Sequence, residues 1–227
     1  MSEGFAYIDI LFFAMVAAFI ALRLRSVLGR RTGQERRRTG GFEPARRNGA
    51  ADNVVALPDR PVSAADADPA IGELADGGLK AGLTQIRVAD HRFDLKGFIA
   101  GARAAFEMIV EAYAAGQKDV LRPLLADDVF AGFAGAIDQR EASGQSLDTQ
   151  LITIRDAQPV EAGMQGSLAR VTVRFASDQI NVLRDAEGNV LEGDPTTAVE
   201  VIDLWTFERD TASSDPNWVL VETRTPN

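Results

Sequence analysis

The sequence contains no cysteine and a single histidine, His91. Without cysteine the chain cannot form disulfides, thiolate zinc sites, iron–sulfur clusters or a cysteine nucleophile. One histidine also excludes a metal site that needs two histidine ligands from this chain. The glycine-rich stretch 77–80 lacks the spacing and the preceding strand of a phosphate-binding loop. We therefore expect neither a metal nor a cofactor.

Positive charge is scarce outside one short region. The net charge of −9 combines three parts: Glu3 and Asp9 in residues 1–22, nine arginines against two glutamates in residues 23–50, and 15 Lys and Arg against 29 Asp and Glu in residues 51–227. An acidic surface of this kind repels phosphate groups. We expect no binding to nucleic acid.

Residues 4–22 form an apolar run in which Asp9 is the only charge. A helix of this length is about 28 Å long, close to the hydrocarbon thickness of a bilayer. A cleaved signal peptide requires a basic start and small residues at its end, and a core helix has a polar stripe; this run has neither. We predict a transmembrane anchor in residues 1–28. Its membrane-facing side chains would be Phe5, Ile8, Ile10, Leu11, Phe12, Phe13, Phe19, Ile20 and Leu22.

The flanking charges predict the orientation of this anchor. Arginines follow the apolar run, and no lysine or arginine precedes it. The positive-inside rule places the N-terminus outside a bacterial-type inner membrane and the rest of the chain, after a single pass, in the cytoplasm. The arginines would also contact anionic lipid headgroups: Arg23, Arg25, Arg30, Arg31, Arg36, Arg37 and Arg38. Residues 29–68 have few large apolar residues and predict a disordered tether.

Residues 69–227 are expected to form an α+β domain in which helices precede strands. Apolar residues at helical spacing between Phe98 and Tyr113 predict a long helix, with Asp94 as N-cap and Gly116 as its stop. One or two helices are expected in 69–89 and a short one near 120–125. A further helix would be capped by Asp127 or Asp128 and would end at Gly144.

After Ser146 the apolar period becomes two, which predicts an antiparallel sheet. Strands are expected at 150–160, 167–183, 197–210 and 217–224. In the second of these, alternation places Ala169, Val171, Val173 and Phe175 on one face. A bent sheet backed by helices is typical of nuclear-transport-factor-two-like or cystatin-like cones, which enclose a cavity. We predict that this cavity is lined by Phe98, Phe106, Val110, Tyr113, Phe133, Asp203 and Trp205.

Two residues are candidates for catalysis. Alternation places Asp203 on the same face as Trp205 and Phe207, where a carboxyl group can have a raised pKa and act as a general base. A bulge would turn it away, and Arg174 or Arg209 would neutralise it. His91 is more simply a capping or surface residue. We predict no catalytic residue and no enzymatic activity.

Several stretches resemble one known family. The N-terminus through Gly33, residues 98–109 and 121–125, the segment Val201–Arg209, and Asp215–Trp218 are similar to alphaproteobacterial TimA adaptors and to the mitochondrial import-motor anchor with its Tim44-like domain. The resemblance implies a non-enzymatic domain at the inner face of a membrane, contact with cardiolipin-type lipids, and a translocase or chaperone as protein partner. The transmembrane anchor and the short tether depart from the mitochondrial pattern.

The leading interpretation is a non-enzymatic, membrane-anchored adaptor in protein translocation or membrane-protein quality control. A second is a domain that binds lipid or another small ligand in the cone cavity. The third is an enzyme with Asp203 as general base.

Overall fold

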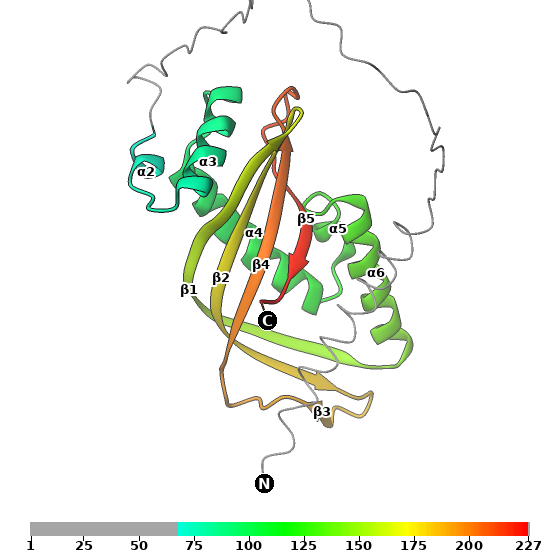
Figure 1. Ribbon diagram of the computed structural model, residues 1–227. Helices are drawn as coiled ribbons and strands as arrows, with labels where there is room; N and C mark the ends of the chain where they lie inside the picture. The colour runs from blue at the N-terminus through cyan, green and yellow to red at the C-terminus, as the bar shows by residue number, and fades with distance from the viewer. Residues whose placement is uncertain (1–67, 227) are drawn as a thin grey trace, which may run out of the picture.

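The computed structural model describes residues 68–226 (Figure 1). The predicted anchor, its membrane-facing residues and the predicted lipid-contacting arginines lie outside the described residues. Within them the helices are α2 (Pro69–Gly72), α3 (Gly77–Ala89), α4 (Leu95–Ala114), α5 (Lys118–Leu121) and α6 (Asp127–Ala142). The strands are β1 (Ser146–Gln165), β2 (Leu168–Arg184), β3 (Val190–Glu192), β4 (Val199–Asp210) and β5 (Val219–Arg224).

Aspartate side chains fix the starts of the first helices. Asp68, Asp76 and Asp94 each accept a hydrogen bond from a backbone N–H in the following turn, at 2.9, 2.9 and 2.6 Å. The predicted cap at Asp94 is thus confirmed. Gly116, which follows the end of α4, has a φ of +70°, a conformation that favours glycine.

The prediction of an aspartate cap for α6 was wrong. Its N-cap is Ala126, whose backbone N–H donates to the carbonyl of Leu220 on β5 at 2.9 Å, while Asp127 and Asp128 lie in the first turn. A contact distant in sequence therefore sets where this helix begins. The two carboxylates favour the helix through its dipole instead.

The sheet is antiparallel, in the order β1–β2–β4–β5, with β3 paired to β2. Pairing of β2 with β4 runs without a shift from Leu168–Asp210 to Gln179–Val199. Pairing of β1 with β2 contains three register shifts, and such bulges bend strands. Figure 1 shows both strands curving below the helices, where residues 146–151, 179–184 and β3 form an extension that we call the arm.

The core lies between the sheet and α4. Ala169, Val171, Val173 and Phe175 are all fully buried, which confirms the predicted alternation in β2. Phe106 of α4 packs on Phe175 and Trp205, with ring centroids 4.5 and 4.6 Å away. The expected arrangement of helices on an antiparallel sheet is confirmed. None of the helices within residues 68–226 combines the length and apolar character needed to span a bilayer.

Candidate binding groove

A groove of ≈ 460 Å³ lies between the first half of α4 and the end of the sheet. One wall is formed by the turn before α4 and by the helix itself; the other is formed by the end of β4 and the loop leading into β5. The lining residues are Arg92, Phe93, Asp94, Gly97, Phe98, Gly101, Ala102, Ala105, Phe207, Arg209, Pro216, Asn217 and Trp218.

Four aromatic rings form the apolar part of this groove. Phe98 is at their centre, with ring centroids 4.8 Å from Trp218, 5.8 Å from Phe93 and 6.1 Å from Phe207. Phe93, Phe98 and Phe207 are buried, whereas Trp218 is partly exposed. Rings in tilted and edge-on contact support one another, so this surface is firmly held.

The α4 side of the groove is made of small residues. Gly97, Gly101 and Ala105 follow one another at a spacing of four, which places them on one face of the helix. A Cβ added at Gly101 would have no neighbour within 4 Å. The helix backbone is therefore approachable from the groove.

Arg209 is a buried cation at the edge of the groove, with 7% of its side chain exposed. Its Nη2 lies 2.7 Å from Oδ2 of Asp90, which is equally buried. Nε of Arg209 has no hydrogen-bond acceptor among residues 68–226. Burial raises the pKa of Asp90, but the backbone N–H of Arg92 and the charge of Arg209 outweigh it and lower the pKa below its usual value.

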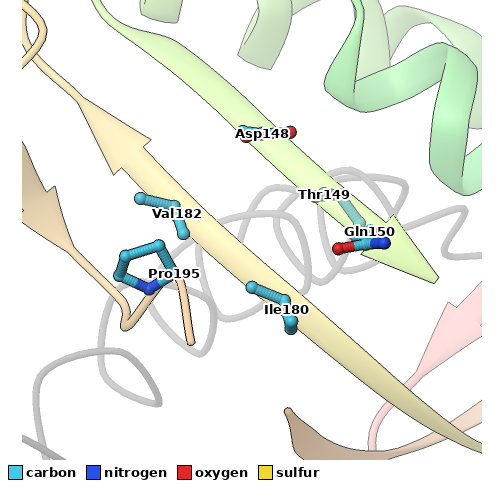
Figure 2. A pocket seen from close by; sticks show the side chains of 6 residues that line it. All are labelled: Asp148, Thr149, Gln150, Ile180, Val182 and Pro195. Carbon is cyan, nitrogen blue, oxygen red and sulfur yellow. The ribbon is translucent and has the colours of Figure 1, made fainter. Parts of the chain in front are cut away.

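A second, smaller hollow lies on the arm and has a volume of ≈ 240 Å³ (Figure 2). Strand β1 contributes Asp148, Thr149 and Gln150, β2 contributes Ile180 and Val182, and Pro195 covers it from the loop after β3. That loop comes so close to β2 that a Cβ at Gly193 would lie 1.9 Å from the carbonyl oxygen of Asn181. With no basic group and little enclosed space, this hollow is a weaker candidate than the groove.

Asp203 lies on the buried face of β4, as its alternation with Trp205 and Phe207 predicted. The pairing with β2 contains no bulge, so the side chain is not turned outward. Burial raises the pKa of Asp203 to about 7. No group within residues 68–226 hydrogen-bonds or ion-pairs with this carboxyl, and Arg209 pairs with Asp90 instead.

The residues predicted to line a cavity are distributed along the whole core. Phe98 lies in the groove, while Phe106 and Trp205 are buried and their rings contact each other. Tyr113 and Phe133 pack against each other at 5.2 Å where α4 meets α6, and Val110 is half-buried. A cavity-lining role for the residues other than Phe98 stays a prediction.

Sequence reasoning missed most of the groove. Two segments more than 100 residues apart form it: one contributes Phe93, Gly97 and Gly101, and the other contributes Trp218. No local sequence pattern predicts that these segments meet. The spacing of Gly97 and Gly101 is the one local sign that this part of α4 is approachable. His91 is exposed next to the groove. Residues 68–226 contain no cluster of three His, Asp or Glu side chains arranged to hold a metal.

Comparison with known proteins connects this domain to a family. The profile of the Tim44-like domain matches residues 79–225. The chain is 23% identical over 184 residues to the mitochondrial import inner membrane translocase subunit TIM44 of Rattus norvegicus and 22% identical to that of Homo sapiens. In both cases the match covers 80% of this chain and 41% of the relative, so the chain spans about two fifths of their length.

A plant relative and a solved structure are also similar to parts of this chain. TIM44-1 of Arabidopsis thaliana is 22% identical over 125 residues, or 55% of this chain and 26% of the relative. The crystal structure of the intermembrane space region of chloroplast protein ARC6 superposes with a TM-score of 0.42 and 12% identity, covering 59% of this chain and 97% of the other. The profile match extends from α3 to the end of β5, and on this basis the chain belongs to the Tim44-like domain family.

Proposed function

We propose that this chain is a non-enzymatic adaptor, anchored in an inner membrane, that acts in protein translocation or membrane-protein quality control. The observation that carries the proposal is the profile match over residues 79–225, because the relatives in this family are named as subunits of an inner membrane translocase. A groove with an apolar floor of aromatic rings supports a binding function.

The charge pattern of the sequence supports the membrane part of the proposal. Residues 4–22 are apolar, and the arginines that follow favour an N-terminus outside and a domain in the cytoplasm. The same arginines, Arg23 to Arg38, are suited to anionic headgroups such as those of cardiolipin. We propose a translocase subunit or a chaperone as the protein partner.

The environment of Asp203 supports one alternative, an enzyme that uses this residue as general base. A buried carboxyl with a pKa raised to about 7 is a suitable general base, and it has no neutralising partner among the described residues. An enzyme would also need a substrate cavity beside this carboxyl, and neither the groove nor the hollow on the arm includes Asp203. Binding of lipid or another small ligand within the cone is the remaining alternative.

The topology is tested with a reporter fused after Asn227 that is active on one side of the membrane only. Because the arginines lie on the C-terminal side of the apolar run, we expect a reporter that works in the cytoplasm to be active and a periplasmic reporter to be silent. A fusion after an added cleaved export signal serves as the control for periplasmic activity. Activity of the periplasmic reporter on the native chain would overturn the orientation.

A further inference from the structure

The floor of the groove is an apolar surface formed by aromatic rings. Phe98 and Trp218 form its centre, and the small residues of α4 leave the space above them open. Since a Cβ at Gly101 would touch nothing within 4 Å, a second backbone can approach the helix closely at this point. A short extended peptide that inserts one aromatic or aliphatic residue fits this shape.

The charged groups along the groove favour a carboxylate. Two guanidinium groups line it, Arg209 buried at its edge and Arg92 with 73% of its side chain exposed. They share the single carboxylate of Asp90, at 2.7 and 3.5 Å, and Nε of Arg209 has no hydrogen-bond acceptor among the described residues. The one carboxylate in the lining, Asp94, already accepts the N–H of Gly97. Arginine is suited to pairing with carboxylates, and the pairing is strengthened where water is displaced by aromatic neighbours.

The net charge of the whole domain favours a peptide over a membrane lipid as the ligand of the groove. Residues 68–227 contain 14 Lys and Arg against 26 Asp and Glu, so an anionic bilayer would be repelled by the body of the domain. A peptide with a single carboxylate meets much less of this repulsion than a charged bilayer surface does, because the repulsion scales with the charge of the ligand. The groove is therefore better suited to a protein segment than to a lipid headgroup in its bilayer.

We infer that the groove between α4 and the β4–β5 loop binds a segment of a protein partner in which a large apolar residue stands next to Asp or Glu. The apolar side chain lies on Phe98 and Trp218, and the carboxylate faces Arg92 and Arg209. This inference rests on the proposed adaptor function and names the chemistry by which the adaptor recognises its partner.

The test is a selection of random octapeptides displayed on phage against the full chain, held in nanodiscs of neutral phosphatidylcholine. We expect enrichment of peptides that carry an aromatic or large aliphatic residue beside Asp or Glu. Gly101→Leu fills the groove, and we expect the selected peptides to bind this variant about tenfold more weakly or worse. Gly135→Leu is the matched control, since Gly135 is an exposed helix glycine of α6 whose added Cβ also meets nothing within 4 Å; binding should not change.

Arginine variants test the charged half of the site. Arg92→Gln should weaken binding about threefold, because exposed ion pairs contribute little, and should reduce its dependence on salt. Arg122→Gln, an exposed arginine at the end of α5, should have no effect. Replacing Asp or Glu by Asn or Gln in the selected peptides should weaken their binding to the native chain as much as Arg92→Gln weakens the binding of the unchanged peptides.

Three outcomes would overturn the inference: no enrichment, enrichment of basic peptides, or peptides that bind Gly101→Leu as well as the native chain. Dodecanoate is included as a competitor. If dodecanoate binds the native chain but not Gly101→Leu, and no peptide is enriched, the groove is a lipid site. The topology and anchoring experiments do not involve the groove, so the adaptor function and this inference can fail independently.

Discussion

At the scale of single residues, Asp203 has an unusual environment for a carboxyl group. It shares the inner face of β4 with Trp205 and Phe207 and lies opposite Phe175 of β2. Transfer of a carboxylate into such surroundings is unfavourable, and the group responds by keeping its proton. Its pKa of about 7 then couples protonation to the stability of the fold.

The direction of this coupling can be measured. Because the folded chain holds a proton that the unfolded chain releases above its ordinary pKa of 3.8, the contribution of Asp203 to stability is complete below that value and is lost as the pH rises through about 7. Between these limits the free energy of unfolding should fall with pH, by at most about 1.4 kcal/mol per unit. Urea unfolding of the full chain and of Asp203→Asn from pH 5 to 8 checks this.

Asp203→Asn should lose this pH dependence and be the more stable chain at pH 8. Parallel stability curves for the two proteins would show that Asp203 is charged in the fold. The same variant separates adaptor from enzyme, since an amide cannot act as a general base. We expect cells that carry it to retain the function of the protein, and loss of function in a stably folded Asp203→Asn chain would favour the enzyme.

At the scale of elements, the close packing of α3 on β1 requires a residue without a side chain at one position of the helix. Gly82 is buried, and a Cβ at this position would lie 2.0 Å from the carbonyl oxygen of Ala162. The obstacle is backbone of a long strand and cannot move without shifting the strand. Close contact between α3 and β1 therefore depends on glycine here.

We predict opposite effects for two glycine-to-alanine changes in helices. Gly82→Ala should destabilise the domain by about 1–3 kcal/mol, the usual cost of overpacking, because α3 must move away from β1. Gly101→Ala should stabilise it by about 0.5–1 kcal/mol, since its Cβ meets nothing and alanine favours the helix. Urea unfolding midpoints check both, and a stable Gly82→Ala chain would contradict the tight contact.

The helices and strands also differ in how well the sequence alone predicts them. The long helix, its cap at Asp94 and the buried face of β2 follow from local periods and were predictable. The start of α6 depends on Leu220 in β5, and β3 is three residues long with no alternation. The pairing of Arg209 with Asp90 and the meeting of Phe98 with Trp218 are set by tertiary packing, which no local pattern contains.

At the scale of the whole molecule, an apolar N-terminal run and a segment with nine arginines precede an acidic Tim44-like domain. The domain carries an excess of acidic residues and would not by itself remain at an anionic membrane. The proposed anchor would keep it near the bilayer at a high effective concentration for partners located there. The central claim is therefore that the anchor acts by holding the domain at the membrane.

Exchange of the anchor tests this claim most directly. In intact membranes of a strain that lacks the native protein, partner capture by crosslinking is compared for the native chain, a chain in which an unrelated transmembrane helix of the same orientation replaces residues 1–22, and the fragment 68–227. We predict that the exchanged anchor preserves capture and that the fragment loses most of it. If the fragment captures the partner as well as the native chain does, recruitment at the membrane is not the mechanism.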